Sequence, residues 1–207
     1  MPGPRAADWA VILVFESLSS GGHIWRMDLD GSNPVRLTNG TGESFPHCSP
    51  DGKSVFYVDM STALALWRVS IEGGNAVKLK EGLGSPYFQI SPDGMRIACQ
   101  TAEFLPTFHW VMLVVASDSG EKLSSVGVLP AATGFSWAPD GRALDFIVTQ
   151  DSVSNLFRLP LTGGPTKQIT NFKSGRIFSS AWSPDGKQLS LARGDIGANV
   201  VLISSSK

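Results

Sequence analysis

Apolar residues in this chain fall in short runs, many of which alternate with polar positions. Residues 25–29 read Trp-Arg-Met-Asp-Leu and residues 67–71 read Trp-Arg-Val-Ser-Ile. This two-residue period is typical of a β-strand with one buried face. No window of the sequence shows the sustained 3.6-residue period of a helix. The pattern therefore predicts an all-β chain built from many short strands.

A recurring turn motif divides this pattern into repeats. Ser-Pro-Asp-Gly begins at residues 49, 91 and 183, and Ala-Pro-Asp-Gly begins at residue 138, so the intervals are 42, 47 and 45 residues. Proline presets the backbone for the second position of a type I turn, and glycine accepts the left-handed conformation that follows. Each copy lies between two apolar stretches, which predicts a tight hairpin between a first and a second strand.

A second recurring signal predicts two more strands in each repeat. Aromatic-Arg pairs at residues 25–26, 67–68 and 157–158 begin short runs that end at glycine turns and lead to one further strand. Residues 112–120 are a looser copy. Four antiparallel strands in a period of about 40–45 residues are typical of a β-propeller blade, because radially stacked sheets cover one another's faces.

We therefore predict a single β-propeller segment over residues 1–207, composed of four-stranded antiparallel blades. The blades, of which the first and last are partial, cover residues 9–38, 45–80, 87–128, 134–170 and 179–204. The strand count leaves two interpretations open: a five-bladed ring with two three-stranded blades at its seam, or an incomplete ring from a longer propeller. We favour the incomplete ring. Its open sheet edges could pair with a second copy of the chain.

The repeats resemble those of the TolB-type, WD-like propeller family. The likeness rests on the four Pro-Asp-Gly turns, on Trp137 and Trp182 before two of them, and on the Asp-Leu-Asp-Gly and Arg-Leu-Thr series in residues 28–38. It covers residues 9–203. The closing stretch, residues 178–203, is similar to the C-terminal blade of propellers attached to bacterial membrane-anchored serine/threonine kinases and winged-helix regulators. The resemblance implies a non-catalytic sensory or interaction module outside the cytoplasmic membrane, in the periplasm.

Composition narrows the classes of partner. The 207 residues carry a formal net charge of -1, so no basic excess exists to neutralise nucleic-acid phosphates. The apolar run near the start, residues 9–15, is far shorter than the roughly 20 residues that cross a bilayer. Asp8 and Glu16 flank this run, which argues against a signal peptide. We expect neither nucleic-acid binding nor membrane insertion by this segment.

Candidate catalytic and metal-binding patterns all have simpler structural interpretations. Residues 134–138, Gly-Phe-Ser-Trp-Ala, are close to the nucleophile elbow of α/β-hydrolases, but they align with the first strand of a blade, and no histidine follows His109. His23, His47 and His109 lack metal-ligand spacing, and residues 28–33 lack the later acidic ligands of a calcium loop. We predict no enzyme activity, no metal and no cofactor.

Three residues receive structural predictions of their own. Cys48 and Cys99 occupy packing positions in neighbouring blades, so we expect buried free thiols and no disulfide. Asp145 interrupts an apolar second strand whose counterparts in other repeats include Phe56 and Ala98. A buried carboxylate without a partner is costly, so Asp145 requires a hydrogen-bonding partner or a hydrated environment.

Variation in loop length predicts a binding face. The connections between strands two and three and between successive blades share one end of the blades and vary in length, which marks a binding face in repeat folds. The longest, residues 101–110, is rich in aromatic residues, which often anchor interfaces. We predict a binding surface that comprises Phe104, Phe108, His109, Trp110, Phe172 and Arg176. Packing of these aromatics beneath the loop, as a satellite core, is the alternative.

A column in the first strands is a second candidate group. It comprises His47, Gln89 and Ser136, which would either face water in a central channel or pair with the neighbouring blade.

Three hypotheses for function follow from these patterns. The first, which we favour, is a non-enzymatic propeller that binds a protein or small ligand within a larger membrane-anchored signalling protein. The second is the substrate-gating propeller of a prolyl-oligopeptidase-type peptidase without its catalytic domain. The third is a truncated reading frame without surviving activity.

Overall fold

The computed structural model describes residues 11–16, 22–61, 63–104, 108–129, 131–183 and 185–195, without the side chains of 11–16, 104 and 108. Within these ranges the chain forms strands and turns and contains no helix, which confirms the all-β prediction. The chain divides into two compact units, Met1–Val128 and Leu129–Lys207, and each is described by itself.

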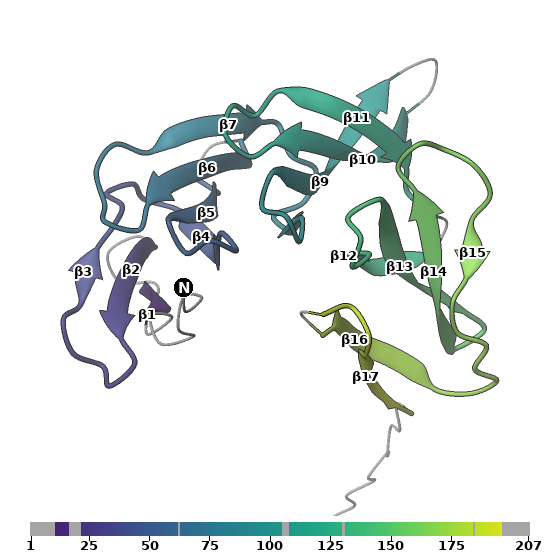
Figure 1. The fold of residues 1–207 in the computed structure, drawn as a ribbon. Helices are drawn as coiled ribbons and strands as arrows, with labels where there is room; N and C mark the ends of the chain where they lie inside the picture. The colour runs from purple at the N-terminus through teal and green to yellow at the C-terminus, as the bar shows by residue number, and fades with distance from the viewer. Residues whose placement is uncertain are drawn as a thin grey trace, which may run out of the picture. The chain divides into compact units, whose positions relative to one another are not determined.

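The first unit contains three antiparallel sheets, in each of which the strands lie side by side in chain order (Figure 1). The first sheet is β1 (Val11–Glu16), β2 (His23–Asp28) and β3 (Val35–Arg36). The second is β4 (Glu43–Cys48), β5 (Ser54–Asp59), β6 (Ala65–Ser70) and β7 (Val77–Glu81). The third is β8 (Phe88–Ile90), β9 (Arg96–Phe104), β10 (Phe108–Ala116) and β11 (Lys122–Gly127).

The second unit contains two sheets with the same order. The fourth sheet is β12 (Ala132–Trp137), β13 (Ala143–Gln150), β14 (Val153–Pro160) and β15 (Lys167–Gln168). The fifth is β16 (Arg176–Trp182) and β17 (Leu189–Gly194). The third strand expected for this last blade, residues 199–204, lies outside the described residues, as do residues 9–10 of the first. Up-and-down sheets of four strands are the blades of a β-propeller.

Within each unit, hydrophobic cores fill the space between consecutive sheets, as blade packing requires. The second and third sheets meet through fully buried side chains such as Phe56 of β5, Leu66 of β6 and Phe88 of β8. The first and second sheets meet through a separate cluster that includes Ile24 and Val55. In the second unit a smaller cluster joins the fourth and fifth sheets: Ile147, Leu156 and Ile177. Within each unit, a sheet therefore covers a face of the next one along the chain.

The repeated turn motif is stabilised by hydrogen bonds among its own residues. The glycines at its end, Gly52, Gly94, Gly141 and Gly186, all have positive φ, between 66° and 73°. In the first copy the Ser49 hydroxyl donates to Asp51 Oδ1 at 2.5 Å, and Asp51 also accepts from the backbone N–H of Lys53 at 3.1 Å. The Ser49 oxygen in turn accepts from the N–H of Ser54 at 3.0 Å. The hydrogen bond from Ser49 keeps the pKa of Asp51 below its usual value.

We expect Ser49→Ala to lower the free energy of unfolding by about 1 kcal/mol at pH 6, because the turn loses the hydroxyl bridge between Asp51 and Ser54. The lowered pKa of Asp51 means that its share of this stabilisation is complete above pH 3.8 and is lost as the pH falls through the folded-state value. Urea unfolding of both proteins at pH 6 and pH 3 should therefore show a smaller difference at pH 3. An equal or larger difference at pH 3 would contradict this coupling.

The structure corrects two sequence predictions. The connection expected over residues 101–110 is mostly strand, because β9 and β10 pair from Arg96↔Ala116 to Phe104↔Phe108 and leave only residues 105–107 between them. Cys99 is buried as predicted, but Cys48 is exposed, so the prediction of a buried thiol is wrong there. The register of β4 against β5 determines which residue lies opposite Cys48. Burial of the Cys48 side chain would also require a neighbouring sheet to pack over it, which strand pairing does not provide.

Candidate functional site

Aromatic rings of differing exposure gather at β4 and at the start of β8 in the first unit. The Phe45 and Tyr87 rings meet edge to face at 5.3 Å between centroids, and the His47 and Phe88 rings do so at 4.8 Å. Phe88 is buried, whereas 62% of Tyr87 is exposed. We call Phe45, His47, Tyr87 and Phe88 the inner aromatic group. Its edge-to-face pairs have the geometry that aromatic quadrupoles favour.

Backbone strain holds Phe45 in this group. Its φ is +56°, and the register of β4 against β5 shifts between Ser44 and His47, which is a β-bulge. A positive φ in a bulky residue costs about 1–3 kcal/mol and persists only where the surrounding structure enforces it. The bulge brings Phe45 against Tyr87. Strain of this kind is concentrated at functional sites.

The members of the predicted channel column differ in environment. His47 is exposed as a residue, yet partial burial of its ring lowers the pKa of His47 below the usual value. Gln89 is partly buried in β8 of the same unit. Ser136 lies in β12 of the second unit, where its buried Oγ has no hydrogen-bond partner among the described residues. Whether the column forms one lining stays a prediction.

The aromatic segment of the first unit forms a long hairpin. Trp110 is 41% exposed, but one edge of its indole lies directly over Gly84, where a Cβ atom would overlap the ring. Across the hairpin Glu103 forms an ion pair with Lys122 at 3.1 Å and lies 4.0 Å from His109. The side chains of Phe104 and Phe108 lie outside the described residues. The Trp110 side chain is therefore partly packed against Gly84 and partly exposed to solvent.

In the second unit Phe172 is packed rather than free. It lies against the cluster of Ile147, Leu156 and Ile177, and the Arg193 guanidinium stands 3.5 Å above its ring. The Asn155 amide clamps its backbone, because Oδ1 accepts from the N–H of Phe172 at 2.7 Å and Nδ2 donates to its carbonyl at 3.2 Å. This is the satellite-core arrangement.

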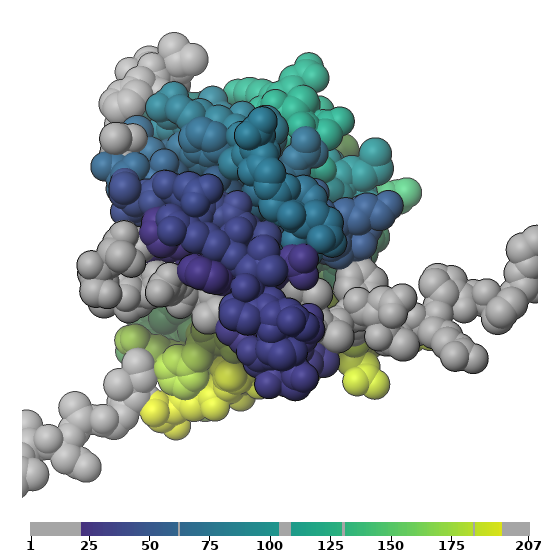
Figure 2. All heavy atoms as spheres, turned by 90° about the vertical axis from the view of Figure 1, so that its left-hand side faces the viewer, coloured from purple at the N-terminus to yellow at the C-terminus, as the bar shows by residue number. Residues whose placement is uncertain are grey.

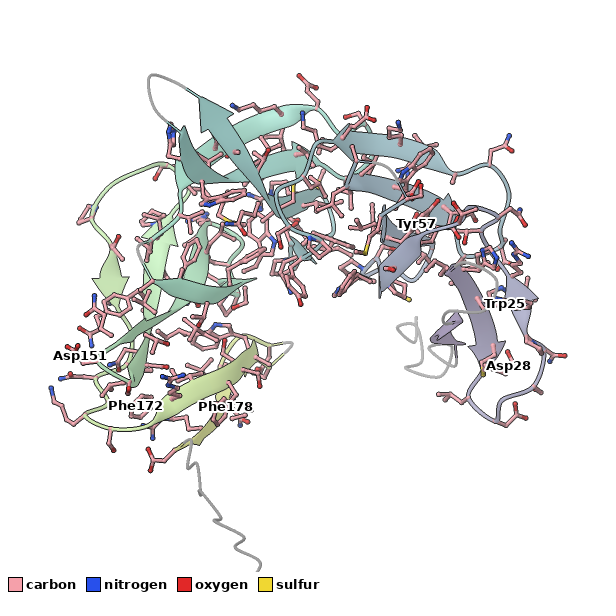
Figure 3. All side chains as sticks on the ribbon, turned by 180° about the vertical axis from the view of Figure 1, so that it is seen from behind. Trp25, Asp28, Tyr57, Asp151, Phe172 and Phe178 are labelled. Carbon is pink, nitrogen blue, oxygen red and sulfur yellow. The ribbon has the colours of Figure 1, made fainter. Side chains whose placement is uncertain are left out.

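The other predicted residue of the second unit, Arg176, begins β16 and lies opposite Gly194 of β17. A shallow groove of about 340 Å³ runs past Phe172 and Asp151. Figure 3 labels both residues. The structure describes Phe172 and Arg176 in one unit and His109 and Trp110 in the other, so their joint surface stays a prediction.

The histidine nearest the start of the described chain belongs to a buried polar cluster. His23 Nδ1 lies 3.2 Å from Glu43 Oε2, and His23 Nε2 lies 2.9 Å from Arg36 Nη2. His23 and Glu43 are 5% and 4% exposed. Arg36 Nη2 also lies 3.1 Å from His23 Nδ1, so the ring has polar neighbours at both nitrogens. His23 therefore has hydrogen-bonding neighbours within this cluster.

Residues 28–33 form a polar turn closed by its own side chains. Asn33 donates to Asp28 Oδ2 at 2.7 Å, and the Ser32 hydroxyl donates to Asp30 Oδ1 at 2.6 Å. Figure 2 shows this β2–β3 turn, in dark purple, standing out from the surface. No cluster of three metal-ligating side chains occurs among the residues that the structure describes. In the same part of the chain no helix is long and apolar enough to cross a membrane.

Asp145 lies at the centre of a buried ion pair in the second unit. It is 1% exposed, and its two oxygens accept from Arg158 Nε at 2.7 Å and Nη2 at 2.9 Å. The indole N–H of Trp182, from the next sheet, donates to Oδ2 at 2.9 Å. The hydrogen bond with Asp145 raises the pKa of Arg158. The prediction that Asp145 has hydrogen-bonding partners is confirmed, and both partners are now identified.

A groove of the first unit lies at the tight-turn ends of the second and third sheets, and it encloses about 630 Å³. Two Pro-Asp-Gly turns and the β10–β11 turn form its rim. Its lining includes Arg68 of β6, Phe56 of β5, and the exposed apolar side chains of Met95 and Leu123. The sequence did not predict this groove, because the predicted binding surface rested on long connections and the turns that form this groove are short. One feature of the sequence does point to this groove. Phe56 occupies the position that Asp145 has in its own repeat, and the arginine of that repeat is retained here as Arg68.

The chain matches no protein-family model, and no curated protein matches its sequence. Many solved structures match its fold. TolB from Acinetobacter baumannii is 19% identical with a TM-score of 0.70, and the match covers 91% of this chain and 48% of TolB. The fold is that of a TolB-like β-propeller. At this identity the similarity establishes the fold alone.

Enzymes share the TolB-like propeller fold. Oligogalacturonate lyase from Vibrio parahaemolyticus is 16% identical with a TM-score of 0.70, and the match covers 91% of this chain and 56% of the lyase. Uncomplexed Pyrococcus horikoshii acylaminoacyl peptidase is 15% identical with a TM-score of 0.64, over 87% of this chain and 33% of the peptidase. The chain thus spans about half the length of TolB and the lyase, and a third of the peptidase.

Proposed function

We propose that this chain is a non-catalytic TolB-like propeller segment that binds a peptide segment of a partner protein through its inner aromatic group. The observation that carries the proposal is the exposed Tyr87 ring, held against Phe45 by a strained backbone. Rigid aromatic side chains bury a large area on binding at little conformational cost. The strain at Phe45 is explained if it presents a preformed surface.

The position of Ser136 supports a non-catalytic role. The Gly-Phe-Ser-Trp-Ala sequence lies within β12, whereas a nucleophile elbow places its serine on a sharp turn between a strand and a helix. Resemblance to propellers of membrane-anchored kinases and winged-helix regulators supports two further proposals: an extracytoplasmic location and a place in a larger signalling protein.

The test uses a phage-displayed library of random dodecapeptides, selected on the chain and then measured by calorimetry as synthetic peptides. We expect Tyr87→Ala to weaken the selected peptides at least about tenfold, the loss of one interface anchor. Leu29→Ala is the matched control, because Leu29 is similarly exposed, at 64%, and lies outside the inner aromatic group. Equal affinity for the wild type and Tyr87→Ala, with both folded, would reject this surface.

The substrate-gating propeller of a peptidase is the second candidate function, favoured by the fold match to acylaminoacyl peptidase. The two proposals predict different neighbours in the parent gene. A kinase or winged-helix domain upstream supports a signalling role, whereas an α/β-hydrolase domain downstream supports a gating role.

A further inference from the structure

An arginine follows an aromatic residue in one strand of each of three sheets: Arg26 in β2, Arg68 in β6 and Arg158 in β14. In the fourth sheet Arg158 lies opposite Asp145 in the strand register and holds that carboxylate through two hydrogen bonds. This is the bidentate geometry that matches a planar guanidinium to a carboxylate. The second unit therefore shows what the recurring arginine binds when a carboxylate is available.

In the second sheet the same register position is occupied by Phe56, which lies opposite Arg68. Arg68 is partly buried, and it takes part in no ion pair among the described residues. Its hydrogen bond to the Ser117 carbonyl is long, at 3.5 Å. A guanidinium carries five N–H donors, so Arg68 retains capacity for a planar acceptor.

Arg68 also differs from Arg158 in what surrounds it. It lines the groove of about 630 Å³ at the tight-turn ends of the second and third sheets. The other arginine of that lining, Arg96, is engaged by Asp93, with Nη2 2.9 Å from Oδ2. Arg26, the third member of the series, pairs with Glu72 at 3.1 Å. Among the three recurring arginines, Arg68 is the one without a carboxylate in the described part of the chain.

The acidic side chains of the groove do not supply that carboxylate. Asp51 and Asp93 are turned into their own turns, where each accepts from a serine hydroxyl at 2.5 Å and from a backbone N–H. Asp118 is exposed on the β10–β11 turn and opposes an anion at long range. Beside these polar groups, 70% of Met95 and 51% of Leu123 are exposed. The groove thus offers a cation together with an apolar surface.

We propose that this groove is a second binding site, which takes a carboxylate attached to an aliphatic chain. The carboxylate binds Arg68 as Asp145 binds Arg158, and the aliphatic chain covers Met95 and Leu123. Such a group occurs in a free organic acid, at the C-terminus of a peptide ending in an aliphatic residue, and in a glutamate side chain beside one. None of the residues that line this groove belongs to the inner aromatic group, so the two sites can be tested separately.

The test is a titration of the ¹⁵N-labelled chain with hexanoate, followed by NMR at the arginine Nε–Hε and methionine methyl resonances. We expect saturable shifts at Arg68 and Met95. Arg158 is the internal control, because Asp145 already occupies it. Hexanamide, which has the same chain without the charge, should bind at least tenfold more weakly. Acetate, which lacks the chain, should also bind more weakly than hexanoate.

Variants separate the contribution of the guanidinium from that of charge alone. Arg68→Gln should abolish the hexanoate shifts, and Arg68→Lys should weaken binding at least fivefold, because it keeps the charge and loses the bidentate fork. Arg142→Gln, at an exposed arginine of the second unit, is the matched control and should leave binding unchanged. Asp118→Asn should strengthen binding about twofold through the loss of weak repulsion.

Two peptides identify the source of the carboxylate. Acetyl-Ala-Ala-Leu with a free C-terminus tests the chain terminus, and acetyl-Glu-Ala-Leu-amide tests the side chain; binding of hexanoate alone assigns a free acid. Equal binding of hexanoate and hexanamide to the wild type would overturn the proposal, even if Arg68→Gln failed to fold. Retained binding by a folded Arg68→Gln, equal shifts at Arg158, or no binding of any probe would also overturn it.

Discussion

Asp145→Ala is expected to lower the free energy of unfolding of the second unit by about 3 kcal/mol, the lower part of the range for removing one partner of a buried ion pair. The substitution leaves the guanidinium of Arg158 and the indole N–H of Trp182 without their acceptor. Because the Arg158 side chain is 27% exposed, water can relieve part of the cost. Urea unfolding monitored by tryptophan fluorescence measures the change.

Two further variants test whether the buried charge causes this loss. Trp182→Phe removes a single hydrogen bond to Asp145 and should cost about 1 kcal/mol. Asp145→Leu combined with Arg158→Met removes both charges and should recover most of the stability lost in Asp145→Ala, because an apolar pair of similar volume often replaces a buried ion pair without loss. If Asp145→Ala costs no more than Trp182→Phe, the ion pair contributes little.

The second large effect is expected for Gly120→Ala, which should lower the free energy of unfolding of the first unit by about 3 kcal/mol. Gly120 has a φ of +74°, a conformation that costs an L-residue roughly 1–2 kcal/mol. A Cβ atom there would overlap the backbone carbonyl of Leu79, so the β10–β11 turn of the third sheet would have to move away from β7 of the second. Forced overpacking of this kind adds about 1–3 kcal/mol.

Gly163 provides the matched control. It lies at the corresponding turn of the fourth sheet with a φ of +78°, but a Cβ atom there meets nothing within 4 Å. Gly163→Ala should therefore cost only the backbone contribution, about 1–2 kcal/mol. The difference between the two variants measures the close approach of the second and third sheets. Equal losses in chemical unfolding would show that the third-sheet turn can move freely.

The blades could be predicted from the sequence because their determinants are local. A Pro-Asp-Gly turn needs three consecutive residues, and the alternation of apolar and polar residues from Trp25 to Asp28 needs one strand. The structure contains these turns and strands in the predicted order. The need for partners at Asp145 could also be predicted, because burial of a charge is costly wherever it occurs.

The features that could not be predicted from the sequence depend on contacts between residues that are far apart in the chain. Trp182 lies 37 positions from Asp145 in the sequence, and no pattern along one strand identifies it as the donor. The strand pairing of residues 101–104 with 108–111 could not be predicted from the sequence, which favours a connection over residues 101–110, because the pairing depends on a cross-strand register. Phe172 carried the composition of a binding loop, but its contact with Arg193 packs it. The groove at Arg68 arises between two sheets, which no single repeat encodes.

The self-contained Ser-Pro-Asp-Gly corner has an evolutionary consequence. Since its hydrogen bonds close within residues 49–54, recombination could duplicate or delete a whole blade without redesigning the corner. The link from Arg158 through Asp145 to Trp182 behaves differently, because it joins two particular blades. Homologues that shuffled their blades would keep the corners and lose this link, so its presence records which blades have stayed neighbours.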